Sequence, residues 1–306
     1  MIGLGKVGMH YGFDPKRIQP ASHISAIINN KRLDLVAVCE NEKNNQKLFL
    51  KKYGKITKIY KKYSKLVEDI NKNLIEFDII VISTPDSTHS EILRYLIKKL
   101  KVKNKKNIIF CEKPLALNSN ISKKLKTASV NSKLNIIVNH SRRWSKIWQE
   151  SSKLSKQIGE IRKAVFNFST SPENITNSQI RDGIHIADLI GWFNLENKTQ
   201  INRLHTPYFV YDFHLWGENG KIEVLDWGQT LNFYKIKKSN RFQGFKELKL
   251  IYTKKINESM MVNTYDEFVK FLDNKKRLST NFDDAVNAVE IFEKYVLDKK
   301  LSINNN

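Results

Sequence analysis

Residues 3–8 have the sequence GLGKVG, in which three glycines follow the spacing GxGxxG. In a dinucleotide-binding turn the first glycine permits a tight turn and the second lets the backbone approach a pyrophosphate. The third lets the next helix pack closely on the strand. By itself the spacing is a weak signal, because glycine turns without a ligand share it. The candidate cofactor residues of the turn are Gly3, Gly5, Lys6, Val7 and Gly8.

Short apolar, β-branched segments alternate with stretches of helical spacing after this turn. The segments predicted to be buried strands are 33–40, 77–83, 107–112 and 134–139. The stretches predicted to be helices are 42–53, 62–72, 87–100 and 119–131. Such alternation predicts βαβ units and a parallel sheet. We therefore expect residues 1–140 to form an α/β Rossmann domain with a doubly wound parallel sheet.

An acidic residue, Glu40, ends the second predicted strand. A carboxylate at this place accepts hydrogen bonds from the adenosine ribose hydroxyls and repels a 2′-phosphate, so the sequence favours NAD over NADP. The distance from the glycines exceeds the usual roughly twenty residues. Residues 12–20 (GFDPKRIQP) are expected to form an inserted loop that accounts for the excess. A solvated glutamate is the alternative for Glu40.

Only Met1 and Ile2 precede the glycine turn, whereas a typical strand has about five or six residues. The first strand of a doubly wound sheet is central, so a short one would leave ladder groups unpaired and a void between the helical layers. We therefore expect the native protein to carry further β-branched residues upstream.

A second pattern starts after about residue 145. The segments in which apolar and polar residues alternate are 161–170, 208–216, 220–226 and 230–236, and the predicted helices are 182–194, 263–273 and 283–298. The alternation predicts a sheet with one face covered by helices and one face free. Residues 141–306 are thus expected to form an α+β domain with an open, largely antiparallel sheet. A free sheet face is a common place for subunits to meet, so we expect a homodimer or homotetramer through it.

The composition excludes several classes of protein. No window reaches 18 uninterrupted apolar residues and no secretory signal is present, so we expect a cytoplasmic protein without a membrane partner. The net charge of +22 invites a nucleic-acid interpretation, but the lysines are spread along the chain, as in 98–106 (KKLKVKNKK). Codon bias explains the joint excess of Lys, Asn and Ile, and no nucleic-acid-binding motif is present. We expect no specific nucleic-acid partner.

The cysteines and histidines indicate neither a disulfide nor a metal. Cys39 and Cys111 end two predicted strands that lie three positions apart in the doubly wound order, about 14 Å, so both are expected to be buried thiols. His10, His23 and His140 lack the spacing of a metal site, and no zinc-type cluster exists.

Four further motifs point to one family. They are STPDSTH at 83–89, EKP at 112–114, NHSRRW at 139–144 and DGIHIAD at 182–188. In this order and spacing they resemble the Gfo/Idh/MocA family, named for glucose–fructose oxidoreductase, inositol dehydrogenase and a rhizopine-catabolism protein. The resemblance covers nearly the whole chain, including 214–225 (HLWGENGKIEVL), which is similar to the family's strand, tight turn and return strand. The motifs are a specific signal for the family and a weak signal for the identity of the substrate.

The resemblance implies an NAD-dependent enzyme that moves a hydride between nicotinamide and a secondary alcohol or ketone. The substrate class it implies is a sugar, sugar nucleotide or cyclitol. Lys113 and His185 match the family's catalytic lysine and histidine, one from each domain. Alcohol oxidation needs a base for the hydroxyl proton and a donor for the developing oxyanion, and a lysine near oxidised nicotinamide should have a lowered pKa. The other cofactor contacts implied are Ser83, Thr84, Pro85, His89 and Glu112.

One departure from the family concerns the helix of the second domain. Many members carry Asp four residues before the histidine, where this chain has Arg181, and the nearest carboxylate is Asp182. Positions three and four residues apart lie on neighbouring parts of a helix face, so Asp182 is expected to orient His185. Asp188, three residues after His185, is the alternative carboxylate that could orient it. The alternative role for Asp188 is a structural bond to the helix or sheet.

The resemblance also implies substrate contacts. Two guanidinium groups, those of Arg142 and Arg143, suit an anionic substrate group, with a domain-interface salt bridge as the alternative. The full candidate substrate set is Lys113, Arg142, Arg143, Trp144, Arg181, Asp182 and His185. The resemblance further implies a cis peptide bond between Lys113 and Pro114.

Two other functions compete with this one. The first is a non-catalytic dinucleotide-binding homologue, motivated by Arg181. The second is a charge-driven nucleic-acid-binding protein, for which a salt-sensitive complex at physiological ionic strength would be required.

Overall fold

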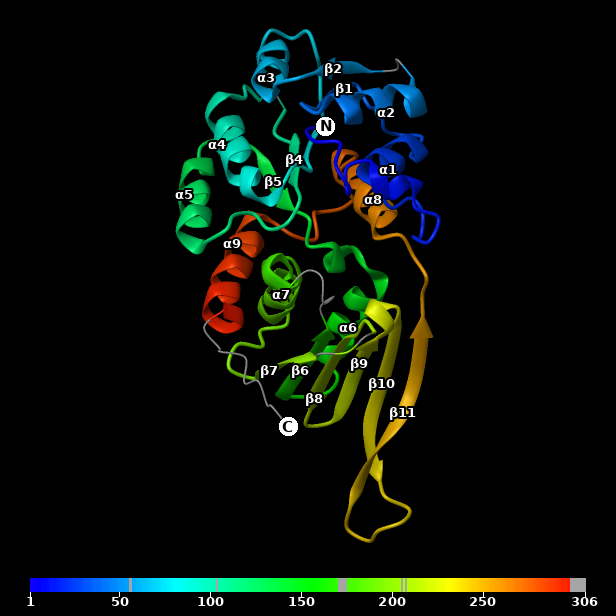
Figure 1. Ribbon diagram of the computed structural model, residues 1–306. Helices are drawn as coiled ribbons and strands as arrows, with labels where there is room; N and C mark the ends of the chain where they lie inside the picture. The colour runs from blue at the N-terminus through cyan, green and yellow to red at the C-terminus, as the bar shows by residue number, and fades with distance from the viewer. Residues whose placement is uncertain (55–56, 103, 170–174, 205, 207, 298–306) are drawn as a thin grey trace. The chain divides into compact units, whose positions relative to one another are not determined.

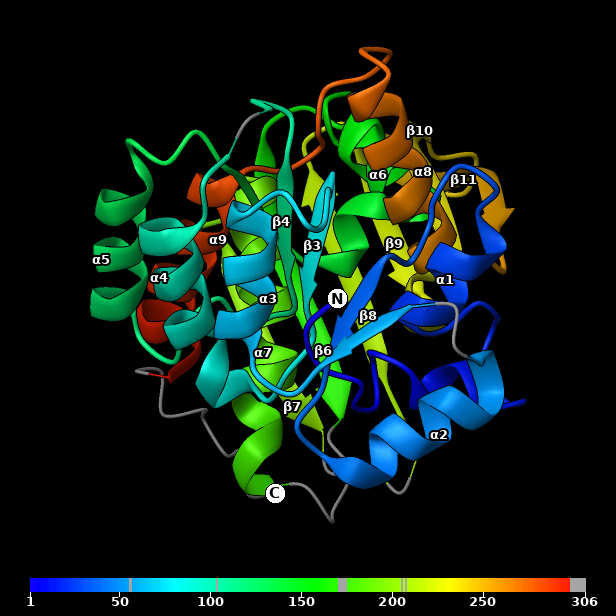
Figure 2. The same ribbon diagram turned by 90° about the horizontal axis from the view of Figure 1, so that it is seen from above.

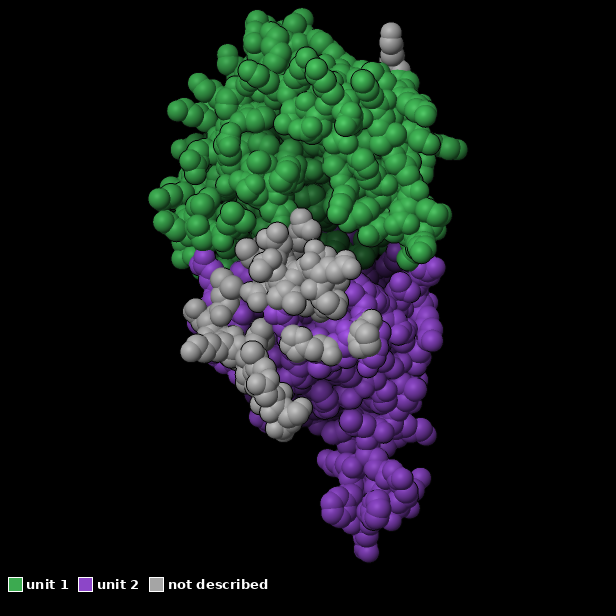
Figure 3. All heavy atoms as spheres, in the orientation of Figure 1, with its two compact units in different colours: residues 1–141, 259–290 green, residues 142–258, 291–306 purple. Residues whose placement is uncertain are grey.

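A computed structural model describes residues 1–54, 57–102, 104–169, 175–204, 206 and 208–297, without the side chains of 175–182 and 297. The chain forms two compact units, coloured separately in Figure 3. Unit 1 contains residues 1–141 and 259–290, and unit 2 contains residues 142–258 and those from Ile291 onward. Residues 259–290 therefore belong with the first domain, whereas the sequence pattern placed them in the second.

Unit 1 is built on one parallel sheet (Figure 1). Its strands are β1 (Ala37–Cys39), β2 (Lys58–Tyr60), β3 (Ile79–Ile82), β4 (Ile108–Cys111) and β5 (Asn135–Val138). Ile2 bridges Cys39 on one side and Ile82 on the other, which joins β2-β1 to β3-β4-β5. This order confirms the predicted doubly wound sheet.

The short segment before the glycine turn pairs with both neighbours. The N–H of Ile2 donates to the carbonyl of Val81 at 2.7 Å, and the N–H of Gly3 donates to the carbonyl of Cys39 at 2.8 Å. The N–H of Ser83 in turn donates to the carbonyl of Ile2. The glycine turn is thereby fixed between the ends of β1 and β3.

Helices cover both faces of this sheet. They are α1 (His23–Asn29), α2 (Lys43–Tyr53), α3 (Tyr63–Asn71), α4 (His89–Lys99), α5 (Ser119–Ser129) and α8 (Met260–Leu272). A further helix, α9 (Phe282–Ile291), is linked to α5 by the ion pairs Lys126–Asp283 and Lys123–Glu290. Figure 2 shows α3, α4 and α5 on one side of β3 and β4, and α1 and α8 on the other. The ring of Phe110 on β4 lies 4.9 Å from that of Phe268 and 6.3 Å from that of Tyr265. These buried aromatic contacts explain why α8 belongs to unit 1.

The helix that follows the glycine turn is interrupted by the expected inserted loop. The N–H of Met9 donates to the carbonyl of Gly5, which closes one helical turn before the chain enters residues 12–20. The N–H of His23 then donates to the carbonyl of Val7 at 3.0 Å, so α1 continues from that first turn. The insertion therefore lengthens the chain between glycines and Glu40 without changing the sheet.

Unit 2 contains a six-stranded sheet in the order β11-β10-β9-β8-β6-β7. The strands are β6 (Ile161–Ser169), β7 (Thr199–Leu204), β8 (Tyr211–Gly217), β9 (Gly220–Leu225), β10 (Thr230–Lys238) and β11 (Lys246–Lys255), and only the β6–β7 pair is parallel. Its helices are α6 (Lys146–Ser155) and α7 (Ile175–Trp192). The 3-10 segments η1, η2, η3 and η5 span His10–Phe13, Asp86–Thr88, Ser141–Trp144 and Asp226–Gly228, and the π-helix η6 spans Phe292–Leu297.

One face of this sheet is packed by helices. Trp148 of α6 lies 5.4 Å, ring to ring, from Phe213 of β8, which also contacts Phe193 and Phe166. Along β8 and β9 buried residues alternate with half-exposed ones, as the sequence alternation predicted. The predicted α+β domain with an open, largely antiparallel sheet is confirmed.

Several elements lie outside the predicted ranges. They are α1, β2, α6, β7 and β11. In β11 the apolar positions are exposed rather than buried, Leu248 and Leu250 by 47% and 48%, so its pattern carries no core signal. Cys39 and Cys111 are buried free thiols, as predicted. In the part of the chain that the structure describes, no helix has the length and apolar character needed to cross a membrane.

Candidate active site

The glycine turn has the geometry of a dinucleotide-binding turn. Gly3 has φ +93°, and a Cβ there would lie 2.7 Å from the carbonyl oxygen of Ser83. A Cβ on Gly8 would lie 2.7 Å from the carbonyl oxygen of Gly3. Around Gly5, by contrast, nothing lies within 4 Å of the position of a Cβ. The first and third glycines are therefore required by packing, and the second leaves open space that fits the close approach of a pyrophosphate.

Glu40 lies directly beside this turn. Its Oε2 accepts the N–H of Leu4 at 2.7 Å, and its Oε1 accepts the N–H of Glu42 at 2.8 Å. The side chain of Asn45 donates to Oε2 at 3.4 Å. A carboxylate has about four lone-pair sites, so Glu40 can still accept a ribose hydroxyl. Glu40 directly follows β1, the position of the acidic residue that contacts the adenosine ribose in Rossmann folds.

The loop after β3 completes the cofactor cradle in unit 1. Ser83 Oγ donates to the carbonyl of Gly3 at 2.9 Å, and Thr84 packs its methyl group on the same glycine. Thr84 Oγ1 also accepts a hydrogen bond from Thr88 Oγ1 at 2.7 Å. Pro85, which follows, is exposed. The structure thus brings Ser83 and Thr84 together with the glycine turn, as the motif implied.

Glu112 is held by partners that the sequence did not reveal. His23 Nε2 lies 2.8 Å from Glu112 Oε1, and the Asn139 side chain donates to the same oxygen. His23 Nδ1 lies 2.9 Å from the hydroxyl of Tyr265. Burial would raise the pKa of Glu112, but the hydrogen bonds and charge of His23, the Asn139 bond and the charge of Lys113 lower it overall. The Glu112 carboxylate is therefore held in one position by its hydrogen bonds, and it fixes the chain between the end of β4 and Lys113.

Lys113 follows Glu112 at the carboxyl end of β4. Its side chain is half-buried, and the bond to Pro114 is cis, as expected. His89 lies behind the same loops with an exposure of 0% and both ring nitrogens engaged by backbone carbonyls. The structure therefore places His89 beneath the cofactor loops, where its ring supports them.

In unit 2 the half-buried His185 lies on α7. Asp188, one turn later, is 2% exposed and accepts Arg143 Nε at 2.9 Å and a terminal nitrogen of Arg143 at 2.9 Å. This buried bidentate pair links α7 to the segment η3. Both residues belong to unit 2, so the pair is not the domain-interface salt bridge expected as the alternative for Arg143, whereas it corresponds to the structural alternative for Asp188. The predicted roles of Arg181 and Asp182 concern side chains outside the described part of the chain.

The other residues of the NHSRRW motif differ in accessibility. The guanidinium of Arg142 is half-buried and stands over the ring of Tyr211 at 4.2 Å from its centroid. Trp144 is only 1% exposed. Of the three, Arg142 is thus best able to meet a ligand, while Arg143 and Trp144 hold the segment in place.

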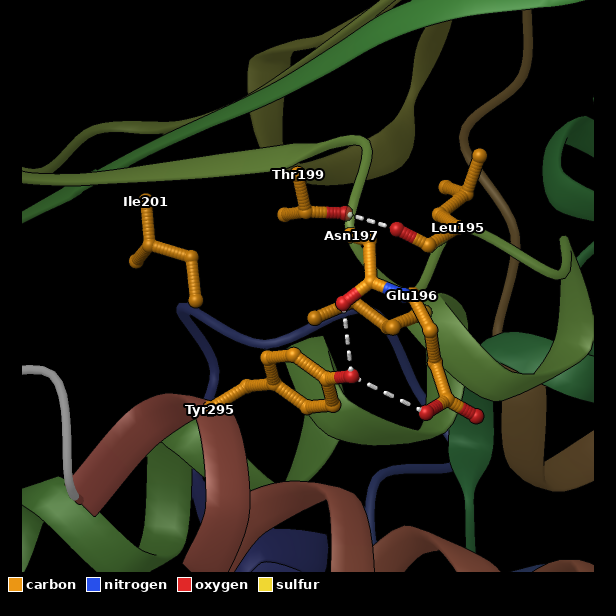
Figure 4. A pocket seen from close by; sticks show the side chains of 7 residues that line it. Leu195, Glu196, Asn197, Thr199, Ile201 and Tyr295 are labelled. Atoms are coloured by element: carbon orange, nitrogen blue, oxygen red, sulfur yellow. Dashed lines mark hydrogen bonds between the residues drawn. The ribbon is translucent and has the colours of Figure 1, made fainter.

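Within the described residues, neither the hollow of Figure 4 nor any cluster of metal-ligating side chains forms a candidate site. The hollow in Figure 4 is lined by Ile190, Leu195, Glu196, Asn197, Thr199, Ile201 and Tyr295. It has room for about one water molecule, too little for a sugar. Within the described ranges, no group of three or more His, Cys, Asp or Glu side chains could hold a metal ion.

Sequence reasoning missed two buried residues near Glu112, namely His23 and Tyr265. The capping sequence that begins with Ser22 marks the start of α1 and hence the position of His23. No local signal links Tyr265 to this place, because it lies 242 residues away from His23 along the chain.

Comparisons with known proteins agree with this geometry. Residues 1–140 match the family model described as "Oxidoreductase family, NAD-binding Rossmann fold". No curated protein sequence matches the chain. Among solved structures, a levoglucosan dehydrogenase in complex with NADH and levoglucosan has 14% identity and a TM-score of 0.72, covering 97% of this chain and 95% of that one.

Two further solved structures have similar folds. One is the UDP-N-acetylglucosamine 3-dehydrogenase from Acidithiobacillus ferrooxidans, with 14% identity, a TM-score of 0.70 and coverage of 97% of this chain and 95% of that one. The other is a 3-ketoreductase from Actinomadura kijaniata in complex with NADP, with 12% identity, a TM-score of 0.67 and coverage of 95% and 94%. At these identities the likeness concerns the fold.

Proposed function

Because residues 1–140 match the Gfo/Idh/MocA oxidoreductase model, we propose that the chain belongs to this family and is an NAD-dependent dehydrogenase or reductase of a carbohydrate-like substrate. The reaction is transfer of a hydride between nicotinamide and a secondary alcohol or ketone of a sugar, sugar nucleotide or cyclitol. The solved structures of similar fold include a levoglucosan dehydrogenase and a sugar-nucleotide dehydrogenase, which supports this substrate class.

The observation that carries the proposal is the edge of the parallel sheet in unit 1. The open glycine turn, Glu40 and Lys113 all lie at the carboxyl ends of its strands. In open α/β sheets this is the edge at which ligands bind. The turn and the Glu40 carboxylate fit a dinucleotide, and Lys113 adds a titratable group for proton transfer.

Each site residue has a part in this chemistry. Bound nicotinamide would supply or accept the hydride at its C4 atom. Lys113 Nζ takes the hydroxyl proton when the alcohol is oxidised and returns it when the ketone is reduced. His185 donates a ring N–H to the substrate oxygen and stabilises the charge that develops there. Asp182 orients His185.

Substrate recognition is assigned to residues beside these two. Arg142 is proposed to bind an anionic group of the substrate, because its planar guanidinium suits a carboxylate or phosphate. Arg143 and Trp144, which are 5% and 1% exposed, support the segment that carries Arg142. Arg181 occupies the position of the family's usual aspartate and is proposed to contact substrate.

Cofactor preference provides the first expected result. The protein should bind NAD at least about tenfold more tightly than NADP, because a 2′-phosphate beside Glu40 juxtaposes like charges. Glu40→Gln should reduce this preference, since the amide keeps an acceptor for the Leu4 N–H and loses the charge. Fluorescence titration with both reduced cofactors measures the two dissociation constants. Tighter binding of NADP by the unmodified protein would contradict the assignment of Glu40.

The function is tested by cofactor reduction with a panel of polyols, sugars, sugar nucleotides and cyclitols, followed by mass spectrometry of any ligand that co-purifies. Turnover with at least one member supports a dehydrogenase. NAD binding without turnover on any member supports the non-catalytic homologue that Arg181 suggests.

Assembly through the sheet of unit 2 is the second expected result. The hairpin of β10 and β11 exposes Phe242, Phe245, Leu248, Leu250 and Ile251 by between 44% and 69%. We infer a homodimer or homotetramer through this sheet, because an exposed apolar edge strand is otherwise a liability. Leu250→Asp should weaken assembly more than about tenfold, as for a buried interface anchor.

Light scattering measures the molar mass of both forms. The matched control is Leu74→Asp, which changes a leucine that is 63% exposed in unit 1 and should leave the mass unaltered. A monomeric unmodified protein at micromolar concentration would contradict this assembly.

A further inference from the structure

His89 connects the two loops that follow β3 and β4. It is the first residue of α4 and is 0% exposed. Its Nδ1 lies 2.8 Å from the carbonyl oxygen of Pro114, the residue after Lys113. Its Nε2 lies 2.9 Å from the carbonyl oxygen of Thr84, two residues after the end of β3. The imidazole ring therefore bridges two segments of the proposed cofactor site.

The chemistry of the two partners fixes the charge of the ring. A carbonyl oxygen only accepts hydrogen bonds, so each ring nitrogen must carry a proton to bond its partner. A neutral imidazole carries one such proton and the imidazolium carries two. In the neutral form one nitrogen lone pair would face a carbonyl lone pair in a site closed to water, which is a costly arrangement.

We propose that His89 is held as an imidazolium at neutral pH and that, by bridging the carbonyls of Thr84 and Pro114, it is a positioning residue for Lys113. The charge state rests on the two carbonyl contacts, and the ring also contacts the Cys111 side chain. The effect on Lys113 rests on the proposed function, because it concerns the lysine assigned to proton transfer. Release of the Pro114 carbonyl would free the backbone directly after Lys113 and widen the range of positions open to its Nζ.

The electrostatic surroundings agree with a cation. Burial lowers the pKa of His89, but the Cys111 side chain and the hydrogen bonds to the two carbonyls raise it to about 10 overall. Cys111, at the end of β4, is the titratable side chain that acts on the ring. The dipole of α4 opposes a cation at this end, but two charge-assisted hydrogen bonds, each roughly twice as strong as a neutral one, outweigh it.

The protonation state can be measured without any enzyme assay. The full chain is labelled with ¹⁵N-histidine, and the His89 signals are identified by their loss in His89→Asn. Both ring nitrogens should show the imidazolium shift, each coupled to one proton, from about pH 6 to about pH 9. Free histidine in the same buffers titrates near pH 6.5 and is the reference. A His89 ring with one unprotonated nitrogen at pH 7 overturns the proposal.

The positioning role has a separate kinetic test. Asparagine can donate to one carbonyl but not to both, so His89→Asn should lower kcat about 10- to 100-fold, as expected when a catalytic group is displaced by about an ångström. KM and the dissociation constant for NAD should change less than about threefold, because the glycine turn is untouched. The control is Lys98→Ala, which removes an exposed side chain from the same helix α4, leaves the His89 bridge and the cofactor loops intact, and should leave kcat and KM unchanged.

The outcomes separate the alternatives. Loss of thermal stability in His89→Asn with unchanged kcat assigns His89 a purely structural role and overturns the positioning claim. If the unmodified protein turns over no substrate, the proposed function fails while the NMR measurement still decides the charge of His89. If His89→Asn does not fold, His89→Gln, which also donates through a single amide group, takes its place, with the same kcat-against-KM criterion.

Discussion

Replacing Lys113 by alanine is expected to lower kcat about 10²- to 10⁴-fold, the usual contribution of a positioned acid or base. Lys113 is half-buried at the end of β4, and its neighbour Glu112 is fixed by His23. The substitution removes the proposed proton acceptor and leaves the glycine turn intact, so the dissociation constant for NAD should stay within about threefold. Steady-state kinetics on an active substrate and cofactor titration measure the two effects.

The control is Lys124→Ala, which removes an exposed lysine on α5 and should leave both quantities unchanged. His185→Ala should lower kcat over a similar range, because the donor for the substrate oxygen is lost. Near-normal turnover in both Lys113→Ala and His185→Ala would remove these two residues from the mechanism.

The second large effect is expected from the buried pair of Arg143 and Asp188. Asp188→Ala should lower the free energy of unfolding by about 3–5 kcal/mol, because it leaves an uncompensated guanidinium that is 5% exposed. The double substitution Arg143→Met with Asp188→Leu should recover most of this loss, since neither charge then remains buried. Urea denaturation of the three proteins, followed by far-UV circular dichroism, gives the free energies.

Lys146→Ala serves as the comparison for this experiment. Lys146 pairs with Glu258 at 3.4 Å, and its side chain is 61% exposed, so its removal should cost less than about 1 kcal/mol. An Asp188→Ala protein as stable as Lys146→Ala would show that the buried pair does not stabilise unit 2.

The fold of unit 1 was predictable because its signals are local. Strands buried on both faces of a parallel sheet have continuous apolar sequences, and β3, β4 and β5 each lie within a predicted segment. By contrast, β2 (Lys58–Tyr60) is short, at the edge of the sheet and partly exposed, so it has no such signal. β11 also lacks a buried-strand pattern in the sequence, because its apolar residues are exposed to solvent.

The domain boundary was not predictable from local pattern. The sequence change after residue 145 indicated that a second domain begins there, but α8 returns to unit 1. The apolar stripe of α8 could pack on the sheet of either domain. The contacts of Tyr265 and Phe268 with Phe110 show that it packs on the sheet of unit 1.

By itself the sequence determined the glycine turn, the acid that follows it, the lysine after β4 and the two kinds of sheet, because each depends on residues close together in the chain. The tertiary structure alone decided the partners of these residues. Glu112 is paired with His23 and Asn139, Arg143 with Asp188, and His89 bonds two backbone carbonyls. Buried polar groups must find partners wherever the packed chain supplies them, and no local pattern records which distant residue that is.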